Sequence, residues 1–224
     1  AITGVVVGIA AVIGWQLWVY YMEDPWTRDG RVRADVVQVA PDVAGIVTEV
    51  AVRDNQTVAE GEVLFRIDHD RYRLALAQAD AAVANRAAAR DQADRDAERY
   101  RRLDVTAISQ AQREQAQSVA QQATAALQQA QADRDLAQLN LDRTEIRAPV
   151  NGIVTNLQLQ VGDYVAAGHP VVAVVDTDSF HVDGYFEETK LDRIQIGDPV
   201  TIYLIGAAAP LRGHVEGIAS AIVD

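Results

Sequence analysis

Two long polar stretches of the chain, residues 71–103 and 110–143, contain neither Pro nor Gly. Most of their residues are strong helix formers, and their apolar residues recur every three or four positions, as along the seam of a coiled coil. The seam positions are Tyr72, Leu76, Ala79, Val83, Ala93, Ala97 and Tyr100 in the first stretch, and Ala116, Val119, Ala123, Ala126, Ala130 and Ala137 in the second. The pattern predicts an antiparallel hairpin of two helices, each about 50 Å long. Ser109, followed three residues later by Gln112, fits a capping box at the start of the second helix.

Shorter alternating runs, typical of β-strands, flank the hairpin as an internal repeat. Residues 40–68 read APDVAGIVTEVAVRDNQTVAEGEVLFRID, and residues 148–176 read APVNGIVTNLQLQVGDYVAAGHPVVAVVD. Both copies contain GIVT followed by V-A-x-G at the same spacing, and Gly45 and Gly152 recur at the same place, which indicates tight bends. Two copies facing each other predict a small β-sandwich with pseudo-twofold symmetry, split by the hairpin.

The first 22 residues carry no charge. A helix of that length spans about 33 Å, enough for a hydrocarbon core of about 30 Å. Aromatic side chains gather at its end, as in an interfacial belt: Trp15, Trp18, Tyr20 and Tyr21. A signal peptide is the alternative, but its apolar core would be shorter and would precede a small-residue cleavage site. We therefore expect a retained membrane anchor. The arginines at 28, 31 and 33 favour the orientation that keeps the residues after the helix on the cytoplasmic side of the membrane.

The remaining alternating runs predict a second β-domain. Residues 31–39 alternate as a strand does, and further strands are expected at 180–186, 199–205 and 211–222, with a helical turn at 187–194. These strands form part of a small barrel that they cannot close by themselves. A strand from before Ala40, or residues beyond Asp224, must complete it.

Composition and motifs argue against several classes of function. The net charge of −12 disfavours nucleic acid and anionic lipid as main partners, since both bind clustered Lys and Arg. The absence of cysteine excludes disulfides, thiolate catalysis and cysteine metal sites. Common nucleophile, phosphate-binding, dinucleotide and zinc-protease motifs are missing. The nearest approach to a metal triplet is Asp68-His69-Asp70, whose adjacent side chains point to opposite faces. We expect no catalytic residue, metal or cofactor.

Each repeat copy resembles the half-motif of lipoyl and biotinyl carrier domains. In those domains the prosthetic group is attached to a Lys at the turn between the halves, and here the helical hairpin replaces that turn. The only lysine, Lys190, lies outside both halves, which excludes a swinging-arm carrier.

The order of these parts resembles the periplasmic adaptor (membrane fusion, HlyD-like) proteins of bacterial tripartite efflux pumps. The nearest likeness is to adaptors of p-hydroxybenzoic acid (aromatic carboxylic acid) efflux pumps, through PWTRDGRVRADVVQVAPDVAG, DNQTVAEGEVLFRIDHDRY, RTEIRAP-x2-G-x-VTNL and the EETKL segment. The fold class implied is mixed α and β and elongated. Its parts are a transmembrane anchor (1–22), a linker and leading strand (23–39), lipoyl-like half 1 (40–68), the α-helical hairpin (69–145), lipoyl-like half 2 (146–176) and an incomplete β-barrel (177–224).

The resemblance implies a non-catalytic adaptor held in the bacterial inner membrane by a single pass, with its bulk in the periplasm. Its partners would be an inner-membrane transporter of the aromatic acid exporter type, a TolC-like outer-membrane channel and further copies of itself, as a hexamer. Adaptors of this family resemble one another in a tip motif of Arg, Leu and Ser that contacts the channel. Arg99, Leu103 and Ser109 fill it here, with a Leu–Ser gap of five residues, one shorter than in the motif.

Two other functions fit the same pattern. One is an adaptor of a multidrug or protein secretion system, although protein secretion adaptors resemble this chain with longer coiled coils. The other is a membrane-anchored envelope scaffold without a role in transport.

Overall fold

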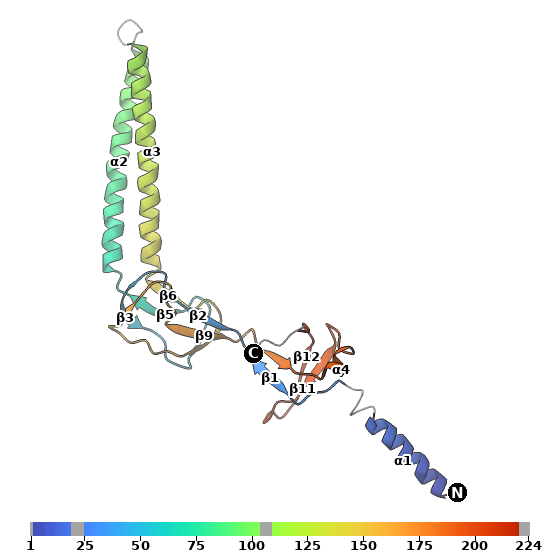
Figure 1. Cartoon of the computed structure of the whole chain (residues 1–224). Coiled ribbons are helices and arrows are strands. Elements are labelled where there is room, and N and C mark those ends of the chain that lie inside the picture. The colour runs from blue at the N-terminus through green and yellow to red at the C-terminus, as the bar shows by residue number, and fades with distance from the viewer. Residues whose placement is uncertain (1, 19–24, 104–108, 220–224) are drawn as a thin grey trace. The chain divides into compact units, whose positions relative to one another are not determined.

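The computed structural model describes residues 2–18, 25–103 and 109–219, which fall into two units. One unit covers residues 34–180 and contains the hairpin and the repeat, and the other combines residues up to 33 with those from 181 onward (Figure 1). The elements, in chain order, are α1 (Ile2–Trp18), β1 (Gly30–Arg33), β2 (Val36–Val39), β3 (Gly45–Val50), β4 (Thr57–Val58), β5 (Val63–Ile67), α2 (Asp70–Arg102), α3 (Gln110–Asp142), β6 (Glu145–Arg147), β7 (Gly152–Thr155), β8 (Tyr164–Val165), β9 (Val172–Asp176), β10 (His181–Gly184), α4 (Glu188–Leu191), β11 (Pro199–Ile202) and β12 (Leu211–His214).

The repeat forms a sandwich of two four-stranded sheets, ordered β2-β9-β7-β4 and β6-β5-β3-β8. Each copy keeps its two longer strands in one sheet and places its short strand in the other, so that β4 pairs with β7 and β8 pairs with β3. Equivalent backbone hydrogen bonds run from Val47 N to Asp163 O at 2.8 Å and from Val154 N to Gln56 O at 2.9 Å. The predicted pseudo-twofold sandwich is confirmed.

The sandwich core comes from the inward residues of both sheets, because side chains alternate faces along a strand. Phe65, Leu64 and Val154 are completely buried. The two recurrent glycines are each the first residue of a strand, β3 and β7, and both are buried beside this core. A Cβ on Gly45 would meet Cγ2 of Ile67 at 2.5 Å, and one on Gly152 would meet the Val175 carbonyl oxygen at 2.3 Å. The glycines therefore allow close approach between neighbouring strands.

The hairpin consists of α2 and α3, each 33 residues long and packed antiparallel. The predicted helix bounds are confirmed to within one residue. Ala93 and Ala130 are buried as expected, but Val119 is 42% exposed and Ala120 is buried in its place. The prediction at that level was wrong because spacings of three and four cannot distinguish neighbouring apolar residues in an Ala-rich helix.

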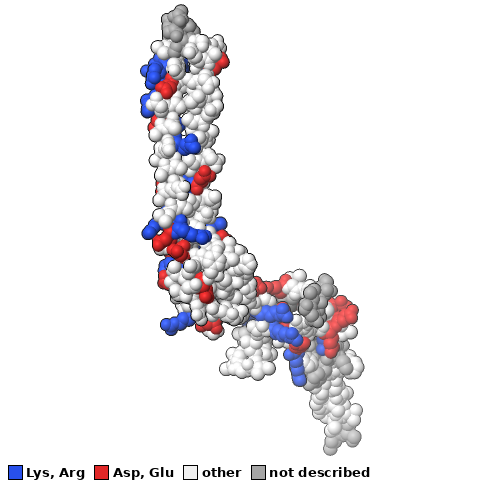
Figure 2. Space-filling view, turned by 60° about the vertical axis from the view of Figure 1, so that its left-hand side comes forward, with Lys and Arg blue, Asp and Glu red and all other residues white. Residues whose placement is uncertain are grey.

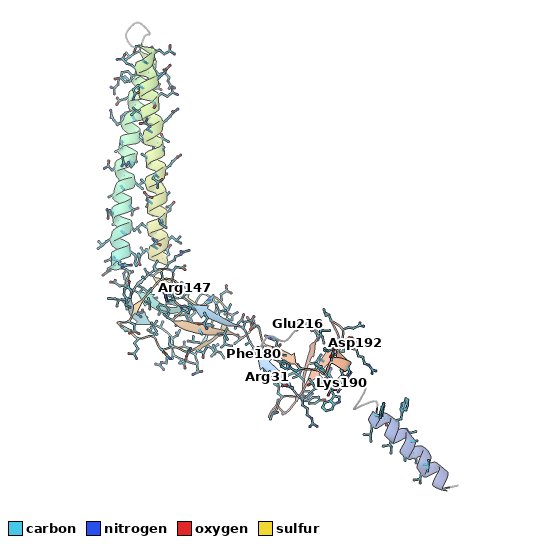
Figure 3. The ribbon with its side chains drawn as sticks, in the orientation of Figure 1. Arg31, Arg147, Phe180, Lys190, Asp192 and Glu216 are labelled. Carbon is cyan, nitrogen blue, oxygen red and sulfur yellow. The ribbon has the colours of Figure 1, made fainter. Side chains whose placement is uncertain are left out.

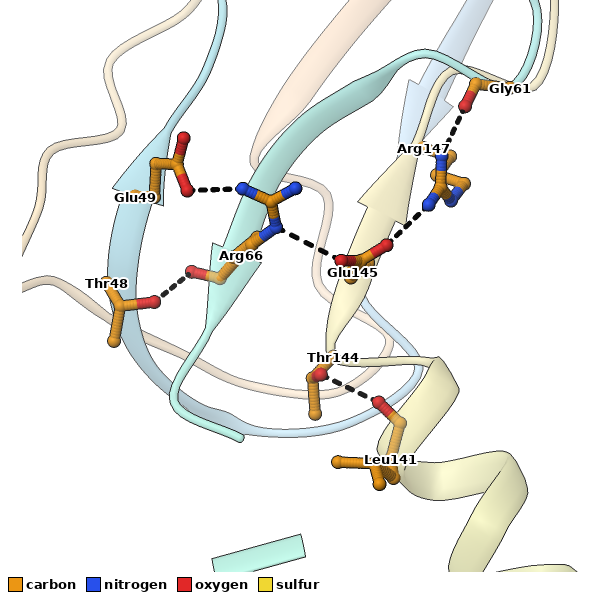
Figure 4. Close-up of polar contacts among 8 residues, drawn as sticks. All are labelled: Thr48, Glu49, Gly61, Arg66, Leu141, Thr144, Glu145 and Arg147. Carbon is orange, nitrogen blue, oxygen red and sulfur yellow. Dashed lines mark hydrogen bonds and ion pairs between the residues drawn. The ribbon is translucent and has the colours of Figure 1, made fainter. Parts of the chain in front are cut away.

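The hairpin is joined to the sandwich through two neighbouring strands, since β5 leads into α2, α3 leads into β6, and β5 pairs with β6. The buried Thr144 hydroxyl donates to the Leu141 carbonyl oxygen at 2.7 Å (Figure 4). On the same sheet, Arg66 bonds both Glu49 and Glu145. The Arg66 hydrogen bond lowers the pKa of Glu145, and the two carboxylates raise the pKa of Arg66.

In the other unit, β1 pairs with β10 and β11 pairs with β12, all antiparallel. The strand from before Ala40 that joins this domain is β1. This confirms one of the two ways of completing the domain that the sequence left open. The single strand predicted over residues 31–39 was wrong. Its backbone breaks at Asp35, whose N–H donates to the Ser179 hydroxyl at 2.7 Å, so β1 and β2 belong to different units.

Lys190 lies on α4 in this second unit and is buried (Figure 3). Its Nζ stands 5.2 Å from the centre of the Trp26 ring and 3.7 Å from Oε2 of Glu187. The aliphatic stem of a lysine covers apolar surface while its ammonium group faces the aromatic ring. Packing against Trp26 accounts for the position of the only lysine in the chain.

Helix α1 has 17 residues, which corresponds to about 26 Å. Among the described residues no helix is long and apolar enough to cross a membrane. The spanning helix predicted over residues 1–22 is thus not found, because the described helix ends at Trp18 and residues 19–22 lie outside the described part.

Candidate docking surface at the hairpin tip

The end of α2 presents basic side chains to solvent. Arg99 is exposed, and its Nη2 lies 2.9 Å from Oδ1 of Asp96. Arg101 and Arg102 share a single carboxylate, Glu98. Arginines in a last turn also interact favourably with the negative end of the helix dipole. Figure 2 shows Lys and Arg side chains gathered near this end of the hairpin.

Leu103 and Ser109 stand on either side of the link, as the last and first described residues around it. Leu103 ends α2 in an extended conformation and is 41% exposed, although an apolar side chain there has no core to join. Ser109 caps α3: its hydroxyl accepts from Gln112 N at 3.3 Å, and its own N–H donates to Oε1 of Gln112 at 3.1 Å. The predicted capping box is confirmed.

A residue that the sequence interpretation missed, Arg113, ties the two helices together here. Its Nη2 donates to the Leu103 carbonyl oxygen at 2.5 Å, ten residues away in the chain. Its Nε is buried without a hydrogen-bond partner. The available signal was its spacing, because Arg113 lies three residues before Ala116 and therefore continues the seam of α3.

A groove of about 430 Å³ lies between the helices next to these residues. Half of its lining residues are alanine or valine, and the exposed Val119 is one of them. The lining residues are Ala93, Asp96, Tyr100, Ala111, Gln112, Gln115, Ala116 and Val119.

The tip therefore combines exposed guanidinium groups, an exposed leucine, a capped helix start and an apolar groove. Exposed arginines beside apolar surface are typical of protein interfaces. Within the described ranges no group of three or more His, Cys, Asp or Glu could hold a metal ion. The exposed arginines and apolar surface suit contact with another protein.

Comparison with known families identifies the chain. Residues 35–177, more than half of the 224 residues, match the family model described as RND MFP, barrel-sandwich hybrid domain. The chain belongs to the RND membrane fusion proteins. Residues 179–224 match an AAEA-like β-barrel domain. This membrane fusion protein thus pairs a barrel-sandwich hybrid, interrupted by a hairpin, with a match to a β-barrel domain.

Solved structures show the same fold. ZneB from Cupriavidus metallidurans is 27% identical with a TM-score of 0.50, covering 84% of this chain and 81% of that one. A membrane fusion protein from Streptococcus pneumoniae is 20% identical with a TM-score of 0.66, covering 86% and 82%. A MacA–MexA chimera carrying the Pseudomonas aeruginosa MexA α-hairpin is 24% identical with a TM-score of 0.57, covering 86% and 67%.

Membrane fusion proteins of this family are periplasmic adaptors of efflux systems and are generally non-catalytic. They link an inner-membrane transporter to an outer-membrane channel, and they form oligomers. The predicted family, the helical hairpin, the lipoyl-like sandwich and the partial barrel are confirmed.

Proposed function

We propose that this membrane fusion protein is the adaptor of a tripartite efflux pump and that its hairpin tip docks onto a TolC-like outer-membrane channel. The observation that carries the proposal is the tip surface itself. Arg99, Leu103 and Ser109 are exposed at the end of the hairpin remote from the sandwich, where folding requires no apolar side chain. The Arg99 guanidinium would bind carboxylates, Leu103 would fill an apolar pocket, and Ser109 would contact the channel while capping α3.

We further propose an inner-membrane transporter of the aromatic acid exporter type, with aromatic carboxylic acids such as p-hydroxybenzoate as cargo. Two observations support this assignment: the four sequence stretches quoted above, and the AAEA-like barrel match over residues 179–224. Copies of the chain would form a ring, a hexamer by resemblance to the family, with the bulk of each copy in the periplasm.

Shortening the hairpin tests the bridging role. Asp80 and Arg134 form a cross-helix ion pair at 3.1 Å, so deleting residues 84–90 and 124–130 removes one heptad from each helix at matching heights. The deletion keeps the seam in register and the tip unchanged, and it draws the tip back by about 10 Å. That distance exceeds the reach of any hydrogen bond or side-chain contact made by the full-length tip.

The experiment measures both export and crosslinking. Every crosslink must come from the introduced cysteine, because the chain has none of its own. Gln110→Cys in the full-length chain should crosslink to the channel in living cells, and the same substitution in the shortened chain should not. Export should fail in the shortened chain while circular dichroism shows it folded. Normal export by the shortened chain would contradict bridging, and a full-length chain that crosslinks to no channel would favour an envelope scaffold.

A further inference from the structure

The apolar loop, residues 203–210, joins β11 to β12 and has the sequence YLIGAAAP (Figure 1). No charged residue occurs from Pro199 to Leu211, although 23% of the residues in the chain are charged. Tyr203 is 79% exposed, and Ile205 is fully exposed. Large apolar side chains that stand in solvent without a charge among them indicate contact with an apolar partner.

A tight turn places Ile205 at the outer end of this hairpin. The Ala207 N–H donates to the Leu204 carbonyl oxygen at 3.2 Å, and Gly206 has a φ of +91°. This bond and this angle are features of a type II turn, in which glycine occupies the third position and Ile205 the second. The turn itself therefore fixes the backbone around Ile205, and the exposed side chain belongs to a defined structure.

Charged residues of the hairpin differ in their distance from the apolar loop. The strand register places Ile202 opposite Leu211 next to the loop. Arg212 follows Leu211 directly and is exposed. Asp198 lies four residues before Ile202, or about 13 Å along the strand, and Glu216 lies five residues after Leu211. A guanidinium beside an apolar tip, with the carboxylates farther away, fits a lipid surface, because Arg binds the phosphate groups that repel carboxylates.

Helix α1, in the same unit, also has an apolar surface and carries no charged residue. Val5, Val6 and Val7 are 63%, 59% and 64% exposed. Because successive residues of an α-helix are turned by about 100°, these three side chains face three different directions. A helix that is apolar on all sides needs apolar surroundings, and lipid supplies them.

The length of the chain keeps the apolar loop close to α1. Only residues 19–24 separate Trp18, the last residue of α1, from Pro25. Fully extended, this link reaches at most about 25 Å. Thr27 already belongs to the β-domain, because its hydroxyl donates to the Tyr185 carbonyl oxygen at 2.5 Å. A bilayer that holds α1 therefore keeps the β-domain, and the apolar loop within it, near the bilayer surface.

We propose that the apolar loop inserts into the surface of the lipid bilayer that holds α1. Ile205 lies among the upper acyl chains, Tyr203 lies at the level of the headgroups, where tyrosine is favoured, and Arg212 binds lipid phosphate groups. Insertion is shallow, because residues 203–210 lie outside the strands and their backbone groups need water. Burial of apolar surface supplies most of the affinity, so zwitterionic lipid suffices. The inference is independent of the docking proposed for the hairpin tip, which belongs to the other unit.

A fluorescent label that reports its depth in the bilayer tests the insertion. The chain has no cysteine, so a label attached to Ile205→Cys has a unique position. The full chain is reconstituted in phosphatidylcholine vesicles without any other protein, and part of the lipid carries a quencher on its acyl chains. The label at position 205 should be quenched several-fold more strongly than the same label on His214→Cys. This matched control is exposed at the opposite end of the same hairpin.

A second pair of variants tests whether the isoleucine drives the insertion. The label is moved to Tyr203→Cys, and this chain also carries either Ile205→Asp or Ile205→Leu. Because burial of one isoleucine side chain changes an equilibrium about tenfold or more, Ile205→Asp should lower the ratio of inserted to free loops at least tenfold. Ile205→Leu should retain the ratio. Both variants keep α1, so their flotation with vesicles should be equal, and a loss of quenching reports the loop alone.

Four results would overturn the proposal. The first is equal quenching at positions 205 and 214 in a chain that circular dichroism shows folded, or a folded chain that does not float with the vesicles. The second is a label at 205 that is shielded from water without lipid, which would show that the chain itself covers the loop. The third is disulfide-linked dimers of Ile205→Cys, which would place a second copy there. The fourth is shielding found only in native inner-membrane vesicles, which would assign the loop to a protein contact. Loss of channel crosslinking by Gln110→Cys would affect only the proposed function, so the two failures are distinguishable.

Discussion

The capping box at the hairpin tip gives the most direct link between one side chain and docking. Ser109→Ala removes the hydroxyl that accepts from Gln112 N at 3.3 Å and leaves that N–H only its 3.1 Å bond to the backbone carbonyl oxygen of residue 109. Loss of an N-cap costs about 0.5–2 kcal/mol, typically about 1 kcal/mol. Both bonds of this box are 3.1 Å or longer and exposed, which places the cost near the middle of that range or below it.

A loss of about 1 kcal/mol raises the opening equilibrium of the first turn of α3 about fivefold. Amide hydrogen exchange measures this opening directly. In the Ser109→Ala chain the amides of Gln112 and Arg113, which both bond to residue 109, should exchange about fivefold faster. Residues 130–141, at the other end of the same helix, serve as the internal control and should not change.

A second substitution separates capping from contact. Ser109→Asp keeps an acceptor at the cap and adds a negative charge that favours the helix N-terminus, so protection should equal or exceed that of the unchanged chain. If Ser109 acts only as a cap, Ser109→Asp should export normally while Ser109→Ala is impaired. If it also contacts the channel, Ser109→Asp should be impaired with protection intact. Unchanged exchange in Ser109→Ala would refute the capping argument itself.

Two further predictions concern the sandwich. Gly152→Ala should lower its stability by about 1–3 kcal/mol, because the new Cβ would meet the backbone carbonyl oxygen of Val175. The equivalent substitution in the other repeat copy, Gly45→Ala, should cost less, because the new Cβ meets only the Ile67 side chain. Hydrogen exchange should therefore accelerate more in β7 of the Gly152→Ala chain than in β3 of the Gly45→Ala chain. The lowered pKa of Glu145 means that the carboxylate stabilises the fold above its unfolded pKa, and this contribution is lost as the pH falls through the folded pKa. Glu145→Gln should therefore flatten the fall in urea midpoint between pH 7 and 3, and a parallel fall in both proteins would contradict the Arg66 interaction.

The hairpin and the repeat were predictable because each leaves a signal within a short window of sequence. The absence of Pro and Gly fixed both helices to within one residue, and the repeated GIVT and V-A-x-G spacing placed the equivalent strands. What the window could not show was which copy supplies each strand of a sheet. The exchange of β4 and β8 between the sheets depends on pairing between residues about 100 positions apart.

The errors have a common physical cause, since each depends on a tertiary contact that leaves no local pattern. Residues 31–39 alternate throughout, yet β1 ends at Arg33, and the Asp35 N–H donates to the Ser179 hydroxyl. Similarly, Val119 and Ala120 are both apolar, and the sequence does not distinguish Ala120, which is buried, from Val119, which lines the groove beside Tyr100. Arg99, Leu103 and Ser109 were named from the family resemblance and remain a prediction, whereas the bond from Arg113 to the Leu103 carbonyl oxygen was not predicted.

The position of the tip depends on the short contacts where the hairpin joins the sandwich. Over a helix of about 50 Å, a tilt of only 10° at that junction would move the tip by about 9 Å, more than a docking contact tolerates. Pairing of β5 with β6 holds both helix ends in one sheet. The Tyr72 hydroxyl, which donates to the Ala44 carbonyl oxygen at 2.7 Å, and the buried Thr144 restrain the first and last turns. The hairpin takes the place of the turn that joins the two halves in lipoyl domains. Its direction is therefore set by β5 and β6, the two paired strands from which α2 and α3 extend.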